Sequence, residues 1–163
     1  YGNNNSYCQD NITSWLDWRM LEKNKDLFEF FKFMIDYRKK HPVIRKKLDN
    51  AVCGMEAMHA HDVNAERMEV PQNAKTLAVS FAGYDRKKGK DDLVYVAVNA
   101  YWEEVKITLP NLANHGAWYL SVDTYGDEKG KYFYQEGEEI RIDREYVMKP
   151  RSIVVFTGRE ILR

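Results

Sequence analysis

Two hydrophobic periods divide the chain, one before about residue 48 and the other after about residue 76. In the first part, apolar residues recur every three or four positions, as on one face of an amphipathic helix: Leu27, Phe30, Phe31, Met34 and Ile35. Phe28 and Phe33 widen this face, so we expect the helix to be covered on more than one side.

Polar residues mark the ends of this helix. Asn24 is a candidate N-cap, and Asp26 lies in the first turn, where the helix dipole favours an anion. Three basic residues at 38–40 suit the last turn, and Pro42 stops the helix. The Asn-rich residues 1–11 are expected to form a loop.

From residue 76 onward, short β-rich runs alternate with turns marked by Gly and Pro. The charged segment 84–92, which contains Gly89, is expected to link the first two runs as a β-hairpin. The pattern predicts an antiparallel sandwich or barrel-like domain of about 90 residues, whereas residues 49–75 show no assignable pattern. The expected strands are 76–82, 93–101, 105–109, 118–122, 131–134, 139–142 and 152–156.

Composition narrows the class of protein. The length of 163 residues suits one domain, or one domain with a further fragment. The 25 Lys and Arg balance the 25 Asp and Glu, which argues against nucleic acid or an anionic membrane as a partner. No stretch approaches the ~20 apolar residues of a membrane span. Aromatic residues make up 13% of the chain, which fits a β-rich core or a sugar-contacting surface.

The two cysteines, Cys8 and Cys53, do not provide a disulfide framework. Reduced thiols and the lack of a signal peptide lead us to expect a cytoplasmic protein. Because the sequence begins at Tyr1 rather than Met, we expect a processed protein or a piece of a longer one.

The common catalytic motifs are missing from the sequence. It has no phosphate-binding glycine loop, no Gly-x-Ser-x-Gly elbow and no Cys-x-x-Cys. His59 and His61 would share one face of a strand beside Asp62, but two ligands from one short run are weak evidence for a metal. A polar loop that contains two histidines is favoured, and we expect neither a metal nor a cofactor.

Adjacent acidic residues are poor candidates for a catalytic dyad, because neighbouring side chains of a strand point to opposite faces. A glycosidase needs two carboxyl groups that face each other across the scissile bond. Solvated turns explain these pairs better: Asp91 and Asp92, Glu103 and Glu104, and Glu138 and Glu139.

Residues 2–18 carry the most informative chemistry. Amides and acids can hydrogen-bond sugar hydroxyls, and aromatic rings stack on the apolar face of a pyranose. The alternative is an Asn-rich loop before a helix, with Trp15 and Trp18 in the core, and physical reasoning alone favours this alternative.

Residues 2–11 read Gly-Asn-Asn-Asn-Ser-Tyr-Cys-Gln-Asp-Asn. They resemble a motif of the isoamylase-type glycogen debranching enzymes of the α-amylase superfamily, with Ser6 where that motif has Ala. The resemblance continues through Ser-Trp-Leu-Asp-Trp at 14–18 and through residues 37–43. Segments 96–99, 109–110, 118–119 and 150–152 are similar to the C-terminal β domain of the same family.

This resemblance implies a fold and an activity. Residues 1–48 would be the tail of a catalytic (β/α)8 barrel, namely the loop after the last strand and the last helix. Residues 49–163 would form an antiparallel β-sandwich C-terminal domain, which makes the fold mainly β. The parent enzyme would hydrolyse α-1,6 branch linkages of glycogen-like α-glucans with retention. Its catalytic Asp and Glu residues precede the motif, so no catalytic residue is expected in this chain, which should be inactive alone.

Active sites of such barrels lie at the loops that follow the strands. We therefore expect Asn5, Tyr7, Asp10 and Asn11 to line the branch-binding cleft, with Tyr7 stacking on a glucose. The alternative is that these residues only brace the loop.

The resemblance also implies partners for the helical segment. Its face of Leu27, Phe31, Met34 and Ile35 would lie against the rest of the barrel. In this chain alone, we expect either self-association through residues 27–37 or disorder in residues 1–20. Trp15 and Trp18 are expected to pack between the barrel tail and the β domain.

Two further interpretations remain open. The β domain would be a non-catalytic glucan-binding module, or the whole chain a free-standing interaction protein with a helical arm. Tyr132 and Tyr134 alternate onto one face and are the first candidates for a sugar platform. The wider set of candidate rings is Tyr84, Tyr101, Trp102, Trp118, Tyr119, Tyr125, Tyr132 and Tyr134.

Overall fold

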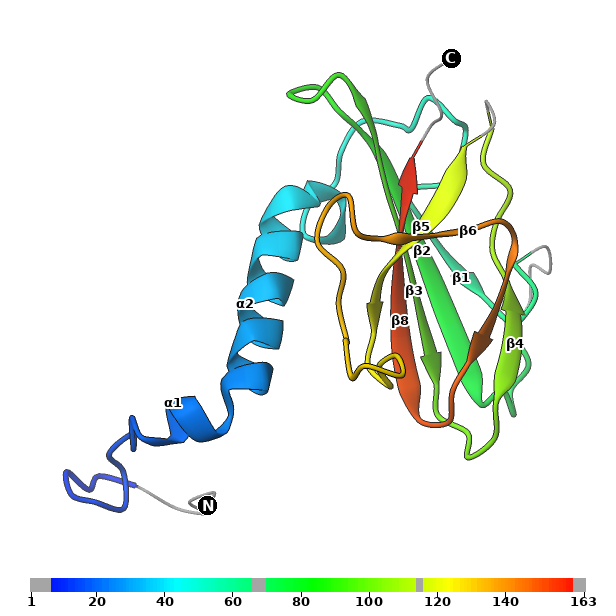
Figure 1. The fold of residues 1–163 in the computed structure, drawn as a ribbon. Helices are drawn as coiled ribbons and strands as arrows, with labels where there is room; N and C mark the ends of the chain where they lie inside the picture. Colours follow the sequence, from blue (N-terminus) through cyan, green and yellow to red (C-terminus); the bar gives the residue numbers. More distant parts are fainter. Residues whose placement is uncertain (1–6, 66–69, 114–115, 160–163) are drawn as a thin grey trace.

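The fold is known from a computed structural model, which describes residues 7–65, 70–113 and 116–159. Two antiparallel sheets face each other, and one long helix covers the outer face of the larger sheet (Figure 1). The elements in chain order are α1 (Met20–Lys23), α2 (Lys25–Lys40), the 3-10 helix η1 (Pro42–Ile44), β1 (Met58–His61), β2 (Thr76–Asp85), β3 (Lys90–Asn99), β4 (Val105–Thr108), β5 (Ala117–Asp123), β6 (Ile140–Ile142), β7 (Glu145–Met148) and β8 (Ser152–Arg159).

The larger sheet has the order β1-β2-β3-β8-β5-β6, and the smaller sheet pairs β4 with β7. The predicted hairpin is confirmed, but β2 and β3 continue through most of the charged segment and pair up to Asp85 opposite Lys90. Gly89 has a φ of +65° and provides the left-handed residue that this tight turn requires.

The strand predictions differ from the structure in three places. Residues 131–134 form no strand and make only the isolated bridge between Val122 and Phe133. Tyr134 there is buried in the main core, and Phe133 is half-buried against α2, so side-chain packing rather than a strand ladder places these rings. Conversely, β1 and β7 were not predicted, because each has only 4 residues and so shows too little alternation.

The main core lies between the two sheets and confirms the predicted mainly β, antiparallel sandwich. From the larger sheet, Tyr95, Trp118 and Phe156 point into it, and Ile107 and Met148 meet them from β4 and β7. All five side chains are almost completely buried. Burial of this apolar surface is the main driving force for the sandwich.

The central strand β3 is buried on both faces. Leu93 and Tyr95 face the main core, whereas Val94 and Val96 face α2. A strand that is covered on both sides has a nearly continuous apolar sequence. This explains why residues 93–98 lack alternation.

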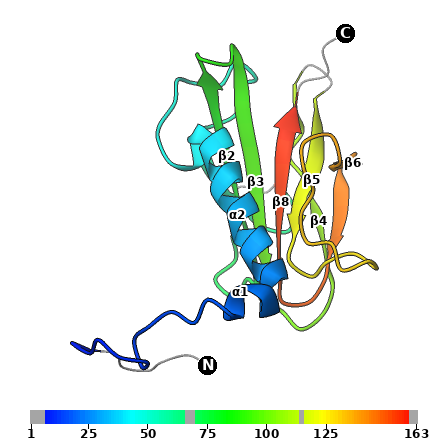
Figure 2. The same ribbon diagram turned by 60° about the vertical axis from the view of Figure 1, so that its left-hand side comes forward.

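Helix α2 packs on the sheet through a face centred on Phe33 and Tyr37 (Figure 2). The ring of Phe33 stacks on Phe133 with 4.6 Å between the ring centroids. The Tyr37 hydroxyl lies 2.8 Å from Thr157 Oγ1. Asn24 does precede α2, but its side chain makes no capping hydrogen bond and its Nδ2 donates to the Met20 carbonyl instead.

Most of the face of α2 that is expected to lie against the rest of a barrel does not contact the β domain. Leu27, Phe31 and Ile35 are exposed, and only Met34 of the predicted four is partly buried. The sheet instead selects the neighbouring face, because there Tyr37 finds a hydroxyl partner and Phe33 finds a ring. The helix is therefore covered on one side only.

The arm, residues 7–24, extends away from the sandwich (Figures 1 and 2). Trp15 and Trp18 are exposed, so the prediction that they pack against the β domain is wrong for this structure. Their apolar surface finds no cover within the described parts of the chain. Residues 1–6 lie outside the described residues, and the prediction about order in residues 1–20 is not tested here.

Candidate functional site

The loop at the start of the arm is held by its own polar side chains. Asp10 Oδ1 accepts a hydrogen bond of 2.7 Å from the Trp15 indole. Asn11 Oδ1 accepts from the Thr13 backbone N–H at 2.9 Å, and Asn11 Nδ2 donates to Gln9 Oε1 at 3.1 Å. The loop is thus a defined turn that precedes α1.

Three of the four predicted site residues are described, and they lie together at this turn. Asp10 and Asn11 are exposed, and Tyr7 is 81% exposed. Asn5 lies outside the described residues. Asp10 and Asn11 brace the loop, as the alternative interpretation expects, and they also remain open to solvent beside two aromatic side chains.

The next turn of the arm is fixed by an ion pair. The Arg19 guanidinium donates to both carboxylate oxygens of Asp17, each at 2.8 Å. These hydrogen bonds hold the pKa of Asp17 below its ordinary value. A bidentate pair of this kind orients the chain just before α1.

A groove of about 600 Å³ lies between the second half of α2, the β2–β3 hairpin and the segment that leads into β6. Three hydroxyl groups line its floor: Tyr37 lies 2.8 Å from Thr157, which lies 2.8 Å from Ser121. Burial raises the pKa of Tyr37 well above its usual range. Tyr37 therefore stays protonated and serves as a hydrogen-bonding group rather than as a base.

The charges around this groove pair with one another. His41 Nδ1 lies 2.6 Å from Asp92 Oδ1, and Lys40 Nζ lies 3.8 Å from Glu136. Arg159 pairs with Glu139. The first two contacts join the end of α2 to β3 and to the segment before β6, and the third joins that segment to β8. We call this group of contacts the clasp, because it holds α2 against the sandwich.

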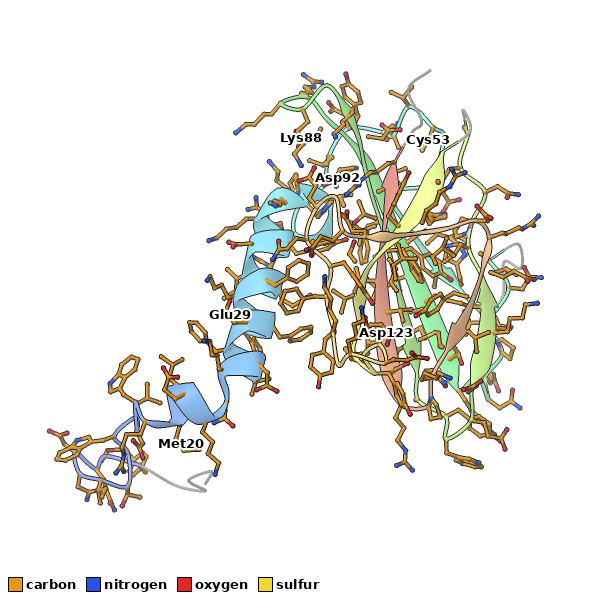
Figure 3. All side chains as sticks on the ribbon, viewed as in Figure 1. Met20, Glu29, Cys53, Lys88, Asp92 and Asp123 are labelled. Atoms are coloured by element: carbon orange, nitrogen blue, oxygen red, sulfur yellow. The ribbon has the colours of Figure 1, made fainter. Side chains whose placement is uncertain are left out.

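Asp91 and Asp92 are not the solvated turn that we predicted. Asp92 is 5% exposed and accepts hydrogen bonds from His41 and from the Val43 N–H at 3.0 Å. Asp91 accepts from the N–H groups of residues 52 and 53 at 2.9 and 2.8 Å. As expected for strand neighbours, the two carboxylates point to different sides, and each fixes part of the connection between α2 and β1. Figure 3 shows Asp92 beside the C-terminal end of α2.

The contacts of His59 and His61 point to a structural role rather than to metal binding. The rings of His59 and His61 lie 4.7 Å apart. His61 Nε2 lies 2.8 Å from Ser80 Oγ and Nδ1 lies 3.2 Å from the Ala65 carbonyl, so both ring nitrogens are engaged. Burial lowers the pKa of His61. The described residues contain no group of three or more His, Cys, Asp or Glu side chains that would hold a metal ion.

The aromatic candidates for a sugar platform separate by burial. Trp118 and Tyr134 belong to the core, so Tyr134 cannot act with Tyr132 as an exposed pair. Trp102 and Tyr125 are 64% and 57% exposed. Sequence reasoning named these rings among others, but only the packing distinguishes them.

Comparison with known proteins identifies the class of this domain. The family model described as "Isoamylase, C-terminal" matches residues 53–157. The matched region comprises almost all of the sandwich. The chain belongs to this isoamylase C-terminal family.

Three relatives illustrate the extent of the similarity. The chain is 30% identical over 125 residues to "Isoamylase 3, chloroplastic" of Oryza sativa subsp. japonica. This alignment covers 76% of the chain and 15% of the rice protein. It is 49% identical over 47 residues to "Glycogen operon protein GlgX homolog" of Mycobacterium tuberculosis, covering 29% of this chain and 6% of the relative. It is 27% identical over 179 aligned residues to "Isoamylase" of a Flavobacterium species, covering 98% and 22% respectively.

The chain thus spans less than a quarter of the length of each of these relatives. Within its described residues, neither the length nor the apolar content of any helix is sufficient to cross a membrane.

Proposed function

We propose that this chain is the C-terminal portion of a glycogen debranching enzyme that hydrolyses α-1,6-glucosidic linkages of branched α-glucans with retention. The observation that carries the proposal is the match of the isoamylase C-terminal family model to residues 53–157. The names of the rice, mycobacterial and Flavobacterium relatives support the same substrate class.

The arm and α2 fit the domain division that the resemblance implies. In this proposal residues 1–48 complete a catalytic barrel, and residues 49–163 form the C-terminal domain. The exposed side chains of Trp18, Leu27, Phe31 and Ile35 support it, because an apolar surface of this extent is typical of one that another part of the protein covers. The barrel would supply the nucleophile and the general acid.

The loop at residues 5–11 would then line the branch-binding cleft. Tyr7 is the residue proposed to stack on a glucose, and Asp10 and Asn11 would bind hydroxyls while bracing the loop. In the intact enzyme, Tyr7→Ala should raise KM or lower kcat for a branched glucan. Unchanged kinetics would leave these residues with a bracing role only.

We also propose a cytoplasmic location, which the separate thiols of Cys8 and Cys53 support.

The direct test uses two proteins, this chain and the complete product of the reading frame that encodes it. Both are incubated with a branched glucan, and new reducing ends are measured against a heat-inactivated control. The complete protein should release reducing ends and the 163-residue chain should not. Release by the chain alone would refute the proposed division of labour, and no release by the complete protein would refute the activity.

A further inference from the structure

Two exposed aromatic sites lie at the same end of the larger sheet, and they are built in the same way. Strands β3 and β5 both run antiparallel to β8 and flank it. Their C-terminal ends therefore emerge at one edge, about two strand spacings or ~10 Å apart. Tyr101 and Trp102 follow the end of β3, and Tyr125 follows the end of β5.

A buried polar side chain holds each site. Asn99 is 1% exposed, and its Oδ1 accepts the Tyr101 N–H at 3.0 Å. Its Nδ2 donates to the carbonyls of Glu103 and Lys149 at 2.9 and 3.0 Å. Through these three hydrogen bonds, the Asn99 side chain fixes the loop after β3 in the absence of a ligand.

Asp123 performs the same task on β5. This carboxylate is buried, and its Oδ1 accepts the Tyr125 N–H at 2.9 Å. Its Oδ2 accepts from the Tyr146 hydroxyl at 2.7 Å. Figure 3 shows Asp123 toward the other end of the sandwich from Asp92 and the clasp. A buried anchor thus holds the backbone two residues further on, at Tyr101 and at Tyr125, and the exposed ring of Trp102 follows directly after Tyr101.

The rings at the end of β3 are arranged as a pair. The centroids of Tyr101 and Trp102 lie 4.3 Å apart, and Lys75 Nζ lies 3.9 Å from the Tyr101 centroid. The turn between β7 and β8 reinforces the arrangement, since the Arg151 N–H donates to the Tyr101 carbonyl at 3.0 Å. Arg151 has a φ of +51°, a conformation that a non-glycine residue keeps only when its surroundings enforce it.

The charges around these rings are of mixed sign. Lys75 and Arg151 are cationic, Glu103 is anionic, and Lys149 pairs with Glu104. The excess is a single positive charge, which is too small a field to select a polyanion. A neutral polymer with apolar ring faces and many hydroxyl groups matches both the exposed rings and the mixed donors and acceptors.

We propose that Tyr101, Trp102 and Tyr125 form a platform that binds a chain of an α-glucan along the edge of the sandwich. The choice of an α-linked polymer rests on the proposed function, whereas the platform itself rests on the geometry above. It replaces Tyr132 and Tyr134 as the sugar-contacting pair of the β domain.

The test is electrophoresis of the 163-residue chain through native gels that contain glycogen, a soluble β-1,4-glucan or no polysaccharide. Glycogen should retard the chain. Trp102→Ala and Tyr125→Ala should each weaken the apparent affinity by roughly tenfold, and the double variant should migrate as in the gel without polysaccharide. Trp18→Ala is the matched control, because that indole is also exposed but lies on the arm, and it should leave the retardation unchanged.

Retardation that survives in the double variant, or that Trp18→Ala removes equally, would overturn the platform. The absence of retardation in every gel would overturn it as well, while hydrolysis by the complete enzyme would still decide the proposed function separately. Retardation only by the β-linked glucan would overturn the α-glucan assignment of the platform, whereas hydrolysis of a branched α-glucan by the complete enzyme would still decide the substrate class of the proposed function.

A second measurement needs no variant. Titration of the isotope-labelled chain with maltoheptaose should shift amide resonances of residues 99–104, 124–126 and 149–153. Shifts confined to other residues would overturn the proposal.

Discussion

Trp118 in the sandwich and Trp18 on the arm have the same side chain in two very different environments. Trp118 is 1% exposed, and its indole donates to the Pro110 carbonyl at 2.7 Å. Trp18 is 74% exposed on the arm. The sandwich encloses a core between its two sheets, whereas the arm and the outer face of α2 present most of their large apolar side chains to the surroundings. The helical region is therefore only half covered.

The sharpest way to test this contrast is to truncate both indoles. Trp118→Ala should lower the free energy of unfolding by about 3–5 kcal/mol, because it removes a large buried ring and leaves a cavity. Trp18→Ala should change it by less than about 0.5 kcal/mol. Urea denaturation of both variants at one pH measures the difference. Equal losses would show that the arm belongs to the folded unit.

The clasp between the two regions can be opened at Asp92. Asp92→Ala leaves the Val43 N–H and the His41 ring without their shared acceptor, which should cost roughly 1–3 kcal/mol. Hydrogen exchange should become faster in residues 33–44 than in the sheet. Asp36→Ala is the matched control, since this carboxylate is exposed on the same helix, and exchange there should be unchanged. Uniform acceleration across the sandwich would instead make Asp92 part of the global core.

The sandwich should also respond to acid through His61. Because burial lowers the pKa of His61 in the folded state, the unfolded chain binds a proton more readily. The free energy of unfolding should therefore fall as the pH drops below the unfolded pKa of ~6.5 and should level off below the folded pKa. His61→Gln should remove this part of the slope in a series of denaturation curves. An identical slope in the variant would assign the acid sensitivity to other groups.

The smallest effect on stability is expected at the exposed face of α2. Replacing Phe31 and Ile35 by Lys should change the free energy of unfolding by less than about 0.5 kcal/mol. It should nevertheless abolish any self-association that sedimentation detects at high concentration, because the apolar face is lost. Arg38→Ala on the same helix should leave association unchanged. Persistence of dimers in the double variant would place their contact elsewhere.

The elements that could be predicted from the sequence are those whose conformation depends on local requirements of the backbone. The strand at residues 93–98 and the turn at Gly89 could be predicted, because β-branched residues and a positive φ are local requirements. The face of α2 could not, since periodicity locates apolar residues without naming their neighbour. Tyr37 was missed because its partner, Thr157, lies 120 positions away in sequence.

The candidate functional site likewise has features that the sequence predicted and features that it did not. The loop at residues 7–11 was found by resemblance, while physical reasoning from the sequence favoured an ordinary loop. The roles of Asp92 and Asn99 were not foreseen, because a buried carboxylate or amide is recognised only by the donors that surround it. An acidic residue beside a hairpin turn has the same sequence appearance whether it is solvated or buried.

The edge strands of the larger sheet limit edge-to-edge association between copies of this chain. The edge strands β1 and β6 have only 4 and 3 residues, and Arg141 places a charge in the middle of β6. Short, charged borders offer few unpaired backbone groups for strand addition by a second molecule. The sheet is thus protected against sideways growth into fibres. Association at high concentration would instead proceed through the exposed face of α2, where polar substitutions can abolish it.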